Sequence, residues 1–171
     1  WPMLVGLHHT AISTPDLERC LGFYCDLLGA ELVERFAWDR GYKRGDKVLQ
    51  LENSAARGAF IKVGKAHLEI FEFSSPEAAT QNPARPVCDH GLTHLCFVVD
   101  DCRSEYRRLL AAGMEFHCTP ELSDDGCVYT YGRDPDGNVV EVLSFLPGYT
   151  CPNTYRDEVA EIQAQQPMIG D

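Results

Sequence analysis

The sequence lacks three features that would point to common classes of protein. Its 171 residues contain no CxxC motif, and no apolar run approaches the roughly 18 residues of a membrane-spanning helix. It also lacks an excess of basic residues, since 15 Lys and Arg stand against 26 Asp and Glu, a formal net charge of -11. Because such a field repels phosphate backbones and anionic lipid, the composition argues against nucleic-acid and membrane partners.

Eight cysteines are spread along the chain without the spacing of a metal site. Cys20, Cys96 and Cys102 fall within apolar patterns, where a thiol behaves as a small hydrophobic group. A disulfide scaffold and a cysteine-rich metal site are therefore not expected. The opening WPMLVGLHH also lacks the basic and long apolar regions of a secretory signal peptide, so we expect a cytoplasmic protein.

What the sequence does contain is an internal repeat. Four residues of the first half recur in the second half at one constant offset: Gly6, Leu7, His9 and Asp16 match Gly91, Leu92, His94 and Asp101. The last strand of each half matches as well, because LEIFEF (68–73) aligns with VEVLSF (140–145). This second match places Glu69 on Glu141.

Each half is predicted to fold as a strand, a helix and further strands. Apolar alternation over 6–13 is followed by a helical pattern that starts near Thr14 and stops at Gly29. The second helix is predicted over 101–113. Further strands are predicted near 31–38, 47–52, 58–64, 66–73, 114–118, 127–133 and 138–145.

The length and the repeat together predict one α+β domain over residues 1–146. Module one spans 6–74, a Pro-, Ser- and Ala-rich linker spans 75–90, and module two spans 91–146. Units of about 60 residues bury too little surface alone, so we expect the two modules to pack together about a pseudo-twofold axis. The tail, 147–171, matches neither half and is predicted to be partly helical.

The repeat singles out His9 with His94 and Glu69 with Glu141. A carboxylate at the same point of two apolar strands costs free energy unless it is solvated, paired or coordinated. Two imidazoles and two carboxylates near a common axis suit a divalent metal such as Zn, Fe, Ni, Mn or Co. A lone strand histidine or glutamate is more often hydrogen-bonded or solvent-facing, but the shared symmetry favours the metal site.

The repeat also distinguishes His9 from its neighbour His8. Adjacent residues of a strand point to opposite faces, and His8 aligns with Thr93 rather than with a second histidine. We therefore expect His8 to lie on the other face of the strand, with no role in the site.

Over residues 6–146 the chain resembles the vicinal oxygen chelate superfamily, which includes glyoxalases, bleomycin resistance proteins and extradiol dioxygenases. The resemblance rests on HHTAISTPDLERCLGFYCDLLGAELV, HLEIFEF, GLTHLCFVVDD and GRDPDGNVVEVLSF. It implies two βαβββ modules that form one open, barrel-like mixed sheet around a metal site. It also implies a homodimer, for which the tail is a candidate interface.

The resemblance to the glyoxalase I-like branch implies a ligand set for one divalent metal ion: His9, Glu69, His94 and Glu141. It implies lyase or isomerase chemistry on a small substrate. The metal would bind two vicinal oxygens and stabilise an enediolate while Glu141 or Glu69 moves a proton. Aromatic residues near the ligand strands are candidate walls for a ring-bearing substrate: Phe71, Phe73, Tyr129, Tyr131 and Trp38.

Other activities within the superfamily remain open. Members similar to extradiol dioxygenases hold Fe(II) with two histidines and one glutamate, here His9, His94 and Glu141. Members of the bleomycin resistance type sequester a ligand without a metal.

The sequence departs from two branches of the superfamily. Ser13 and Phe73 stand where short bacterial glyoxalase I-like enzymes carry the arginine and asparagine that hold glutathione. Glu69 stands where epimerases of acyl-CoA thioesters usually carry glutamine. The match to the glutathione-using and acyl-CoA-using branches is therefore incomplete, and the sequence leaves the substrate open.

Overall fold

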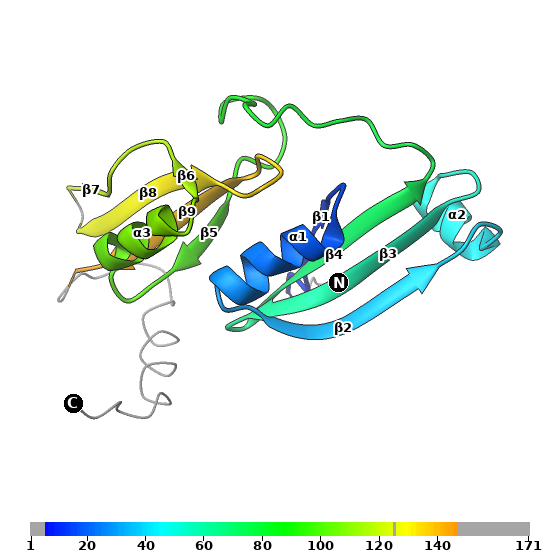
Figure 1. The fold of residues 1–171 in the computed structure, drawn as a ribbon, viewed down its shortest axis with the longest axis horizontal. Helices are drawn as coiled ribbons and strands as arrows, with labels where there is room; N and C mark the ends of the chain where they lie inside the picture. Colours follow the sequence, from blue (N-terminus) through cyan, green and yellow to red (C-terminus); the bar gives the residue numbers. More distant parts are fainter. Residues whose placement is uncertain (1–5, 125, 147–171) are drawn as a thin grey trace, which may run out of the picture.

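The computed structural model describes residues 6–124 and 126–146 of the chain. Over these residues the chain forms two mixed β-sheets, each packed against a helix (Figure 1). The α+β class agrees with the sequence analysis, and so does the order of elements in each half except over residues 47–52. The strands divide into a four-stranded and a five-stranded sheet, however, instead of one continuous barrel-like sheet.

The first sheet has the strand order β1-β4-β3-β2. Its strands are β1 (Thr10–Ser13), β2 (Glu31–Trp38), β3 (Ala55–Val63) and β4 (Ala66–Ser75). Strand β1 runs parallel to β4, and the other pairs are antiparallel. Helix α1 (Leu17–Leu21) and the π-helical segment η1 (Gly22–Leu27) connect β1 to β2, and Gly29 ends the helical run with φ +78°.

The second sheet repeats this arrangement with the order β5-β9-β8-β6. Its strands are β5 (Leu95–Val98), β6 (Glu115–Phe116), β8 (Cys127–Arg133) and β9 (Val139–Phe145), and the short β7 (Glu121–Leu122) pairs with β8. Strand β5 runs parallel to β9, as β1 does to β4. Helix α3 (Cys102–Ala111) follows β5, so the structural repeat matches the repeat in the sequence.

The predicted strand over 47–52 is wrong. A short helix, α2 (Lys43–Leu49), lies there between β2 and β3 and ends at Gln50, which has a left-handed backbone. Val48 is 75% exposed, so this segment has no buried face of the kind that a half-buried strand requires. Asp46 of α2 instead accepts hydrogen bonds from the backbone N–H and the hydroxyl of Ser54, at 2.8 and 2.6 Å.

The two main helices begin in equivalent ways. The side chain of Asp16 caps α1, and that of Asp101 caps α3, by accepting backbone N–H groups of the first turn. The last strand of each module supplies a further acceptor. Glu72 accepts the N–H of Leu17 at 2.6 Å, and the hydroxyl of Ser144 accepts the N–H of Cys102 at 3.1 Å.

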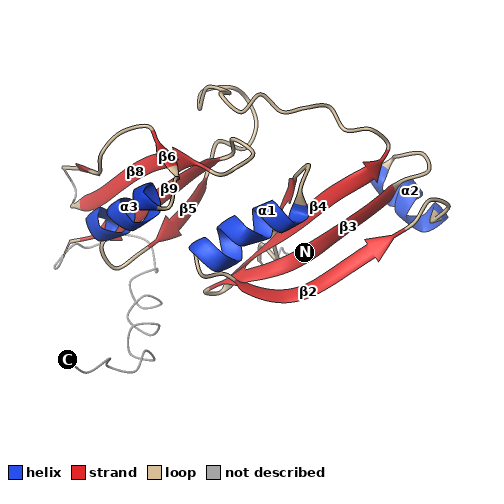
Figure 2. Cartoon of the chain, in the orientation of Figure 1, coloured by secondary structure: helices blue, strands red, loops and turns tan. Residues whose placement is uncertain are grey.

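The core lies between each sheet and its helix, and residues of both modules contribute to one hydrophobic cluster. Ile61 and Ile70 of the first sheet are fully buried in it together with Leu17, as are Val140 and Leu109 of the second module. In Figure 2 both helices lie on the same side of the molecule, in front of their sheets. Because side chains alternate along a strand, each sheet presents its other face away from the helix.

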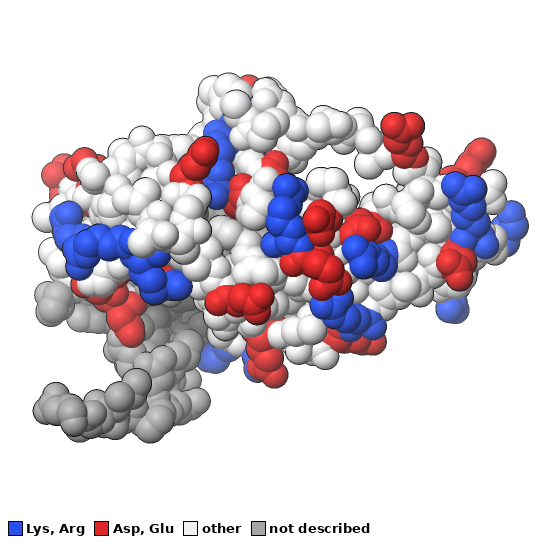
Figure 3. Space-filling model, viewed as in Figure 1, with Lys and Arg blue, Asp and Glu red and all other residues white. Residues whose placement is uncertain are grey.

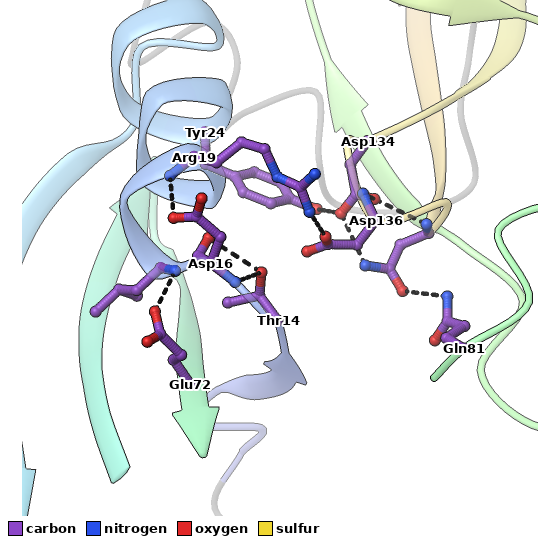
Figure 4. Close-up of polar contacts among 10 residues, drawn as sticks. Thr14, Asp16, Arg19, Tyr24, Glu72, Gln81, Asp134 and Asp136 are labelled. Carbon is purple, nitrogen blue, oxygen red and sulfur yellow. Dashed lines mark hydrogen bonds and ion pairs between the residues drawn. The ribbon is translucent and has the colours of Figure 1, made fainter. Parts of the chain in front are cut away.

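The modules meet where η1 and α1 contact the turn between β8 and β9 (Figure 4). The hydroxyl of Tyr24 donates a 2.9 Å hydrogen bond to Oδ2 of Asp134, and Arg19 forms an ion pair with Asp136. On α3, Arg108 donates to the carbonyl of Leu27 at 2.7 Å. The junction therefore combines a buried hydrogen bond with polar contacts of exposed arginines.

Acidic and basic side chains are interspersed over α1 and the neighbouring strands on the face shown in Figure 3. Glu18 pairs with Arg35 at 2.7 Å, and Glu72 pairs with Arg57 at 2.8 Å. No helix among the described residues is long and apolar enough to cross a membrane.

Candidate functional site

The first candidate pair lies on the face of the first sheet that points away from α1. Nε2 of His9 lies 3.0 Å from Oε2 of Glu69, and the two side chains are 33% and 16% exposed. His9 directly precedes β1, and Glu69 lies in β4 opposite Ala11. The parallel pairing of β1 with β4 therefore brings together two residues that are distant in the sequence.

The second candidate pair occupies the same place in the second sheet. Nε2 of His94 lies 3.1 Å from Oε2 of Glu141, and these side chains are 29% and 13% exposed. His94 directly precedes β5, and Glu141 lies in β9 opposite Cys96. The two modules thus build the same His–Glu pair with nearly the same distance and exposure.

The two pairs do not come together within one chain. Among residues 6–124 and 126–146, no group of three or more His, Cys, Asp or Glu side chains is close enough to hold a metal ion. The first pair belongs to the sheet that contains β1 and β4, and the second to the sheet that contains β5 and β9. Figure 1 shows these as two separate sheets. One chain therefore carries two separate His–Glu pairs, the first and second candidate half-sites.

Each histidine also packs against an aromatic ring on the central strand. The ring of His9 meets Phe60 edge to face at 5.4 Å, and that of His94 meets Tyr131 edge to face at 5.2 Å. Phe60 lies opposite Glu69, and Tyr131 lies opposite Glu141. Phe60 was missed in the sequence because the β3–β4 and β8–β9 connections differ in length, so no single offset aligns it with Tyr131.

Glu141 has polar neighbours that Glu69 lacks. Desolvation, the charge of Glu141 and a hydrogen bond to it raise the pKa of Tyr131 to about 12. The same three causes raise the pKa of Cys96 to about 12. Both groups remain protonated at neutral pH and act as donors to Glu141, whereas Phe60 and Ala11, in the corresponding places, carry no side-chain donor.

Three of the predicted substrate-wall residues gather on the face that carries His9 and Glu69. Phe71 and Phe73 stack with ring centroids 5.5 Å apart, and Trp38 contacts both edge to face at 6.1 and 5.9 Å. Phe36, which the sequence analysis did not single out, joins them at 5.5 Å from Phe71. These four rings are partly buried and form an aromatic wall beside the first half-site.

Trp38 is held in this wall by a chain of hydrogen bonds. Its indole Nε1 donates to the hydroxyl of Ser54 at 3.0 Å, and that hydroxyl donates to Asp46 at 2.6 Å. Ser54 is fully buried, so its two partners leave the hydroxyl satisfied. Helix α2 therefore fixes the indole through a carboxylate that the sequence alone did not connect to the site.

The other two predicted wall residues lie beside the second half-site. Tyr129 and Tyr131 of β8 contact each other edge to face at 6.3 Å. His117 stacks on Tyr131 at 6.5 Å, and desolvation, followed by the charge of Arg133, lowers the pKa of this histidine. This half of the candidate site is consequently more polar than the aromatic wall of the first.

The chain is similar in sequence to proteins named as an epimerase and a lyase. The chain is 30% identical over 155 residues to the 2-epi-5-epi-valiolone epimerase of an Actinomyces species, covering 86% of this chain and 83% of that protein. It is 26% identical over 146 residues to the lactoylglutathione lyase of Schizosaccharomyces pombe, covering 81% of this chain and 47% of that enzyme.

The fold itself matches a solved structure. A glyoxalase family protein from Bacillus cereus superimposes with a TM-score of 0.78 at 19% identity, covering 85% of this chain and 97% of that one. The profile described as the Glyoxalase/Bleomycin resistance protein/Dioxygenase superfamily matches residues 6–142. The chain therefore belongs to the Glyoxalase/Bleomycin resistance protein/Dioxygenase superfamily.

Proposed function

We propose that the protein is a divalent-metal-dependent isomerase or lyase that moves a proton between adjacent carbons of a small oxygenated substrate. The observation that carries this proposal is the repeated His–Glu pair, with Nε2–Oε2 distances of 3.0 and 3.1 Å. Relatives named as an epimerase and a lyase support chemistry of this class.

The donor set fits a divalent transition metal ion. Imidazole nitrogen and carboxylate oxygen are ligands that Zn, Ni, Mn, Co and Fe accept, and both half-sites offer the same two atoms. Glu69 and Glu141 are only 16% and 13% exposed, so each carboxylate is largely withdrawn from water and benefits from a positive partner. His9, Glu69, His94 and Glu141 would hold the ion.

Because each chain carries two separated half-sites, we propose that the working unit is a homodimer. A twofold axis that brings the first half-site of one protomer to the second half-site of its partner creates two identical four-ligand sites. Each site then lies between the aromatic wall of one protomer and the tyrosine side of the other. The active protein would thus need two copies of the chain.

When bound, the ion supplies positive charge that stabilises an enediolate form of the substrate. A carboxylate would take the proton from a carbon beside the carbonyl, and the C–H electron pair would enter the enediolate. The resulting carboxylic acid would exchange its proton with solvent and return a proton to the adjacent carbon. No oxidant is needed. We assign this proton transfer to Glu69, because Tyr131 and Cys96 donate to Glu141 and anchor it, whereas Phe60 and Ala11, at the corresponding places beside Glu69, carry no side-chain donor.

The aromatic wall suggests the shape of the substrate. Trp38, Phe71 and Phe73 present ring faces and edges against which a ring of the substrate can pack. Phe73 and Ser13 leave no charged or amide group in the positions that hold glutathione in similar enzymes. We therefore propose an oxygenated ring compound in place of a glutathione adduct.

Metal content and oxygen use test the proposed chemistry. The purified protein is expected to bind Zn²⁺, Ni²⁺, Mn²⁺ or Co²⁺ and to catalyse exchange of deuterium from D₂O into a panel of α-hydroxyketones, without consuming O₂. Bound Fe(II) with O₂ uptake on a catechol panel would instead show a ring-cleaving dioxygenase. Absence of metal binding would point to a ligand-sequestering protein and overturn the proposal.

Mixed dimers test the shared site. Neither His9→Ala nor His94→Ala alone is expected to retain metal. When equal amounts are unfolded together and refolded, about one quarter of the wild-type metal content should return, because half of the dimers are mixed and each has one intact site. If each chain built its own site, mixing would restore nothing.

Variants of the two glutamates test their separate roles. Glu69→Gln and Glu141→Gln are both expected to lower metal affinity, since each replaces a charged ligand. At saturating metal, Glu69→Gln should still lack deuterium exchange, because the proton-accepting carboxylate is removed, whereas Glu141→Gln should retain it. The opposite pattern would assign the proton transfer to Glu141.

A further inference from the structure

Both candidate ligand histidines have a partner at the ring nitrogen that does not face the glutamate. Nδ1 of His9 lies 2.7 Å from Nδ1 of His8, and Nδ1 of His94 lies 2.9 Å from Oγ1 of Thr93. In each module the partner is the residue immediately before the histidine. The contact therefore repeats the internal symmetry although the two partner side chains differ.

The contact between neighbours contradicts the expectation that His8 points away from His9. Strand β1 begins at Thr10, so both histidines lie in irregular backbone, where the alternation of a strand does not separate adjacent side chains. His8 also stacks on His67 of β4, with ring centroids 6.0 Å apart and ring planes at 10°. Its ring is thus held from two directions.

We propose that His8 and Thr93 are positioning residues that orient His9 and His94 for metal binding, an inference that rests on the proposed function. A histidine that offers Nε2 to a metal carries its proton on Nδ1, and a partner there fixes both the tautomer and the ring orientation. The internal repeat provides this partner twice, at the same position relative to each histidine.

The chemistry of the two partners suits this role. In the metal-free chain Nε2 faces a carboxylate, so a neutral imidazole carries its proton there and Nδ1 accepts. With a metal ion at Nε2, a neutral imidazole would carry its proton on Nδ1, which would then donate. A hydroxyl and a neutral imidazole can each donate or accept, whereas lysine only donates, an ionised carboxylate only accepts and an aliphatic side chain does neither.

Two pairs of variants test the proposal through metal affinity, measured for Zn²⁺ and Co²⁺ by competition with a chromophoric chelator. Thr93→Val removes the hydroxyl and keeps the shape, whereas Thr93→Ser keeps the hydroxyl. His8→Phe keeps a ring to stack on His67, whereas His8→Thr introduces the partner used in the second module. We expect Thr93→Val and His8→Phe to lower affinity about 10- to 100-fold, and Thr93→Ser and His8→Thr to remain near wild type.

The rate at which the histidine Nδ1 protons exchange with water, measured by NMR, separates a positioning role from a general effect on the fold. In the zinc-loaded protein, the Nδ1 protons of His9 and His94 should exchange slowly with water. Thr93→Val is expected to speed exchange at His94 alone, and His8→Phe at His9 alone, while the urea midpoint of each metal-free variant stays that of the wild type.

The outcomes distinguish this inference from the proposed function. If the wild type binds metal and Thr93→Val and His8→Phe bind it equally well, the positioning role is overturned and the metal site stands. If the wild type binds neither ion, both are overturned. Equal losses in Thr93→Val and Thr93→Ser would also overturn the positioning role, because the hydroxyl would then not be the cause.

Discussion

The hydroxyl of Tyr24 in η1 donates a 2.9 Å hydrogen bond to Oδ2 of Asp134, in the turn before β9. Tyr24 is fully buried and Asp134 is 5% exposed, so this bond joins the two modules inside the protein. Burial and the neighbouring charge of Asp134 raise the pKa of Tyr24 well above its usual value, which keeps the phenol protonated as a donor. The remaining acceptor sites of Asp134 are used within its own turn, by Asp136 and Asn138.

Tyr24→Phe is therefore expected to lower the free energy of unfolding by about 1–3 kcal/mol, because Asp134 loses a donor while staying buried. Urea unfolding followed by circular dichroism measures the change. Tyr42→Phe is the matched control, since Tyr42 lies on the surface, and it should shift stability by less than about 0.5 kcal/mol. Equal effects of the two variants would contradict the importance of the junction bond.

Gly58 allows the ring of Phe36 to lie directly over β3. A Cβ at this position would come within 2.5 Å of Phe36 Cζ and of the carbonyl oxygen of Ile70. Gly58→Ala is expected to destabilise the protein by about 1–3 kcal/mol, because both the ring and the backbone must move. Differential scanning calorimetry measures the shift in Tm.

Gly22→Ala provides the control for that substitution. A Cβ at Gly22 meets nothing closer than Oδ2 of Asp26 at 3.8 Å, and the residue lies in a helical segment. Alanine there should be neutral or should stabilise by up to about 1 kcal/mol. A loss of stability as large as that of Gly58→Ala would show that added volume at Gly58 is not the cause.

Glu72, which accepts a hydrogen bond at the start of α1, makes the stability of the protein depend on pH in the acid range. Its hydrogen bond with Arg57, and then that from the N–H of Leu17, hold its pKa below the usual 4.5. A carboxyl whose pKa is lowered by folding stabilises the protein above about pH 4.5, and this contribution is lost as the pH falls through the folded-state pKa. Glu72→Gln should therefore cost about 1 kcal/mol at pH 7, allowing for screening at its partly exposed site.

The urea midpoints of Glu72→Gln and wild type are expected to converge as the pH is lowered from 7 to 3, because the wild-type carboxyl is then neutral as well. A difference that stays constant over this range would mean that Glu72 contributes through packing and not through its charge.

The cysteines should differ sharply in reactivity. Burial raises the pKa of Cys20 to about 12 and that of Cys102 to about 11, whereas Cys88 and Cys118 are exposed. Because the thiolate is the reacting form, iodoacetamide at pH 8 should modify Cys88 and Cys118 and spare Cys20 and Cys102 until urea is added. Peptide mass spectrometry measures the extent of labelling at each cysteine. Labelling of Cys20 before urea is added would show that α1 opens readily.

Much of the candidate site could be predicted from the repeat, because the repeat reports positions and not isolated residues. The alignment of His9 with His94 and of Glu69 with Glu141 predicted one site of four residues. The structure instead pairs His9 with Glu69 and His94 with Glu141, in two separate places. Phe60 was not predicted, because it corresponds to Tyr131 only in the pairing of the strands, and a fixed sequence offset does not describe that pairing.

The contact of His8 with His9 also could not be predicted from the sequence. It depends on where β1 begins, and a difference of one or two residues at a strand end decides whether neighbours point apart or meet. The helix α2 was missed for a related reason, since apolar alternation predicts a strand only where a sheet is present to pair with it.

The sequence by itself determined which residues share a face, since the alternation of side chains along β4 and β9 is a local property of extended backbone. That property placed Glu69 with Phe71 and Phe73, away from the helix. Only the tertiary structure decided that the two His–Glu pairs lie on separate sheets. The orientation of one module against the other depends on contacts between residues far apart in the chain, such as Tyr24 with Asp134. The residue types in each half-site therefore follow from the local sequence, whereas the assembly of a complete site depends on how whole modules pack.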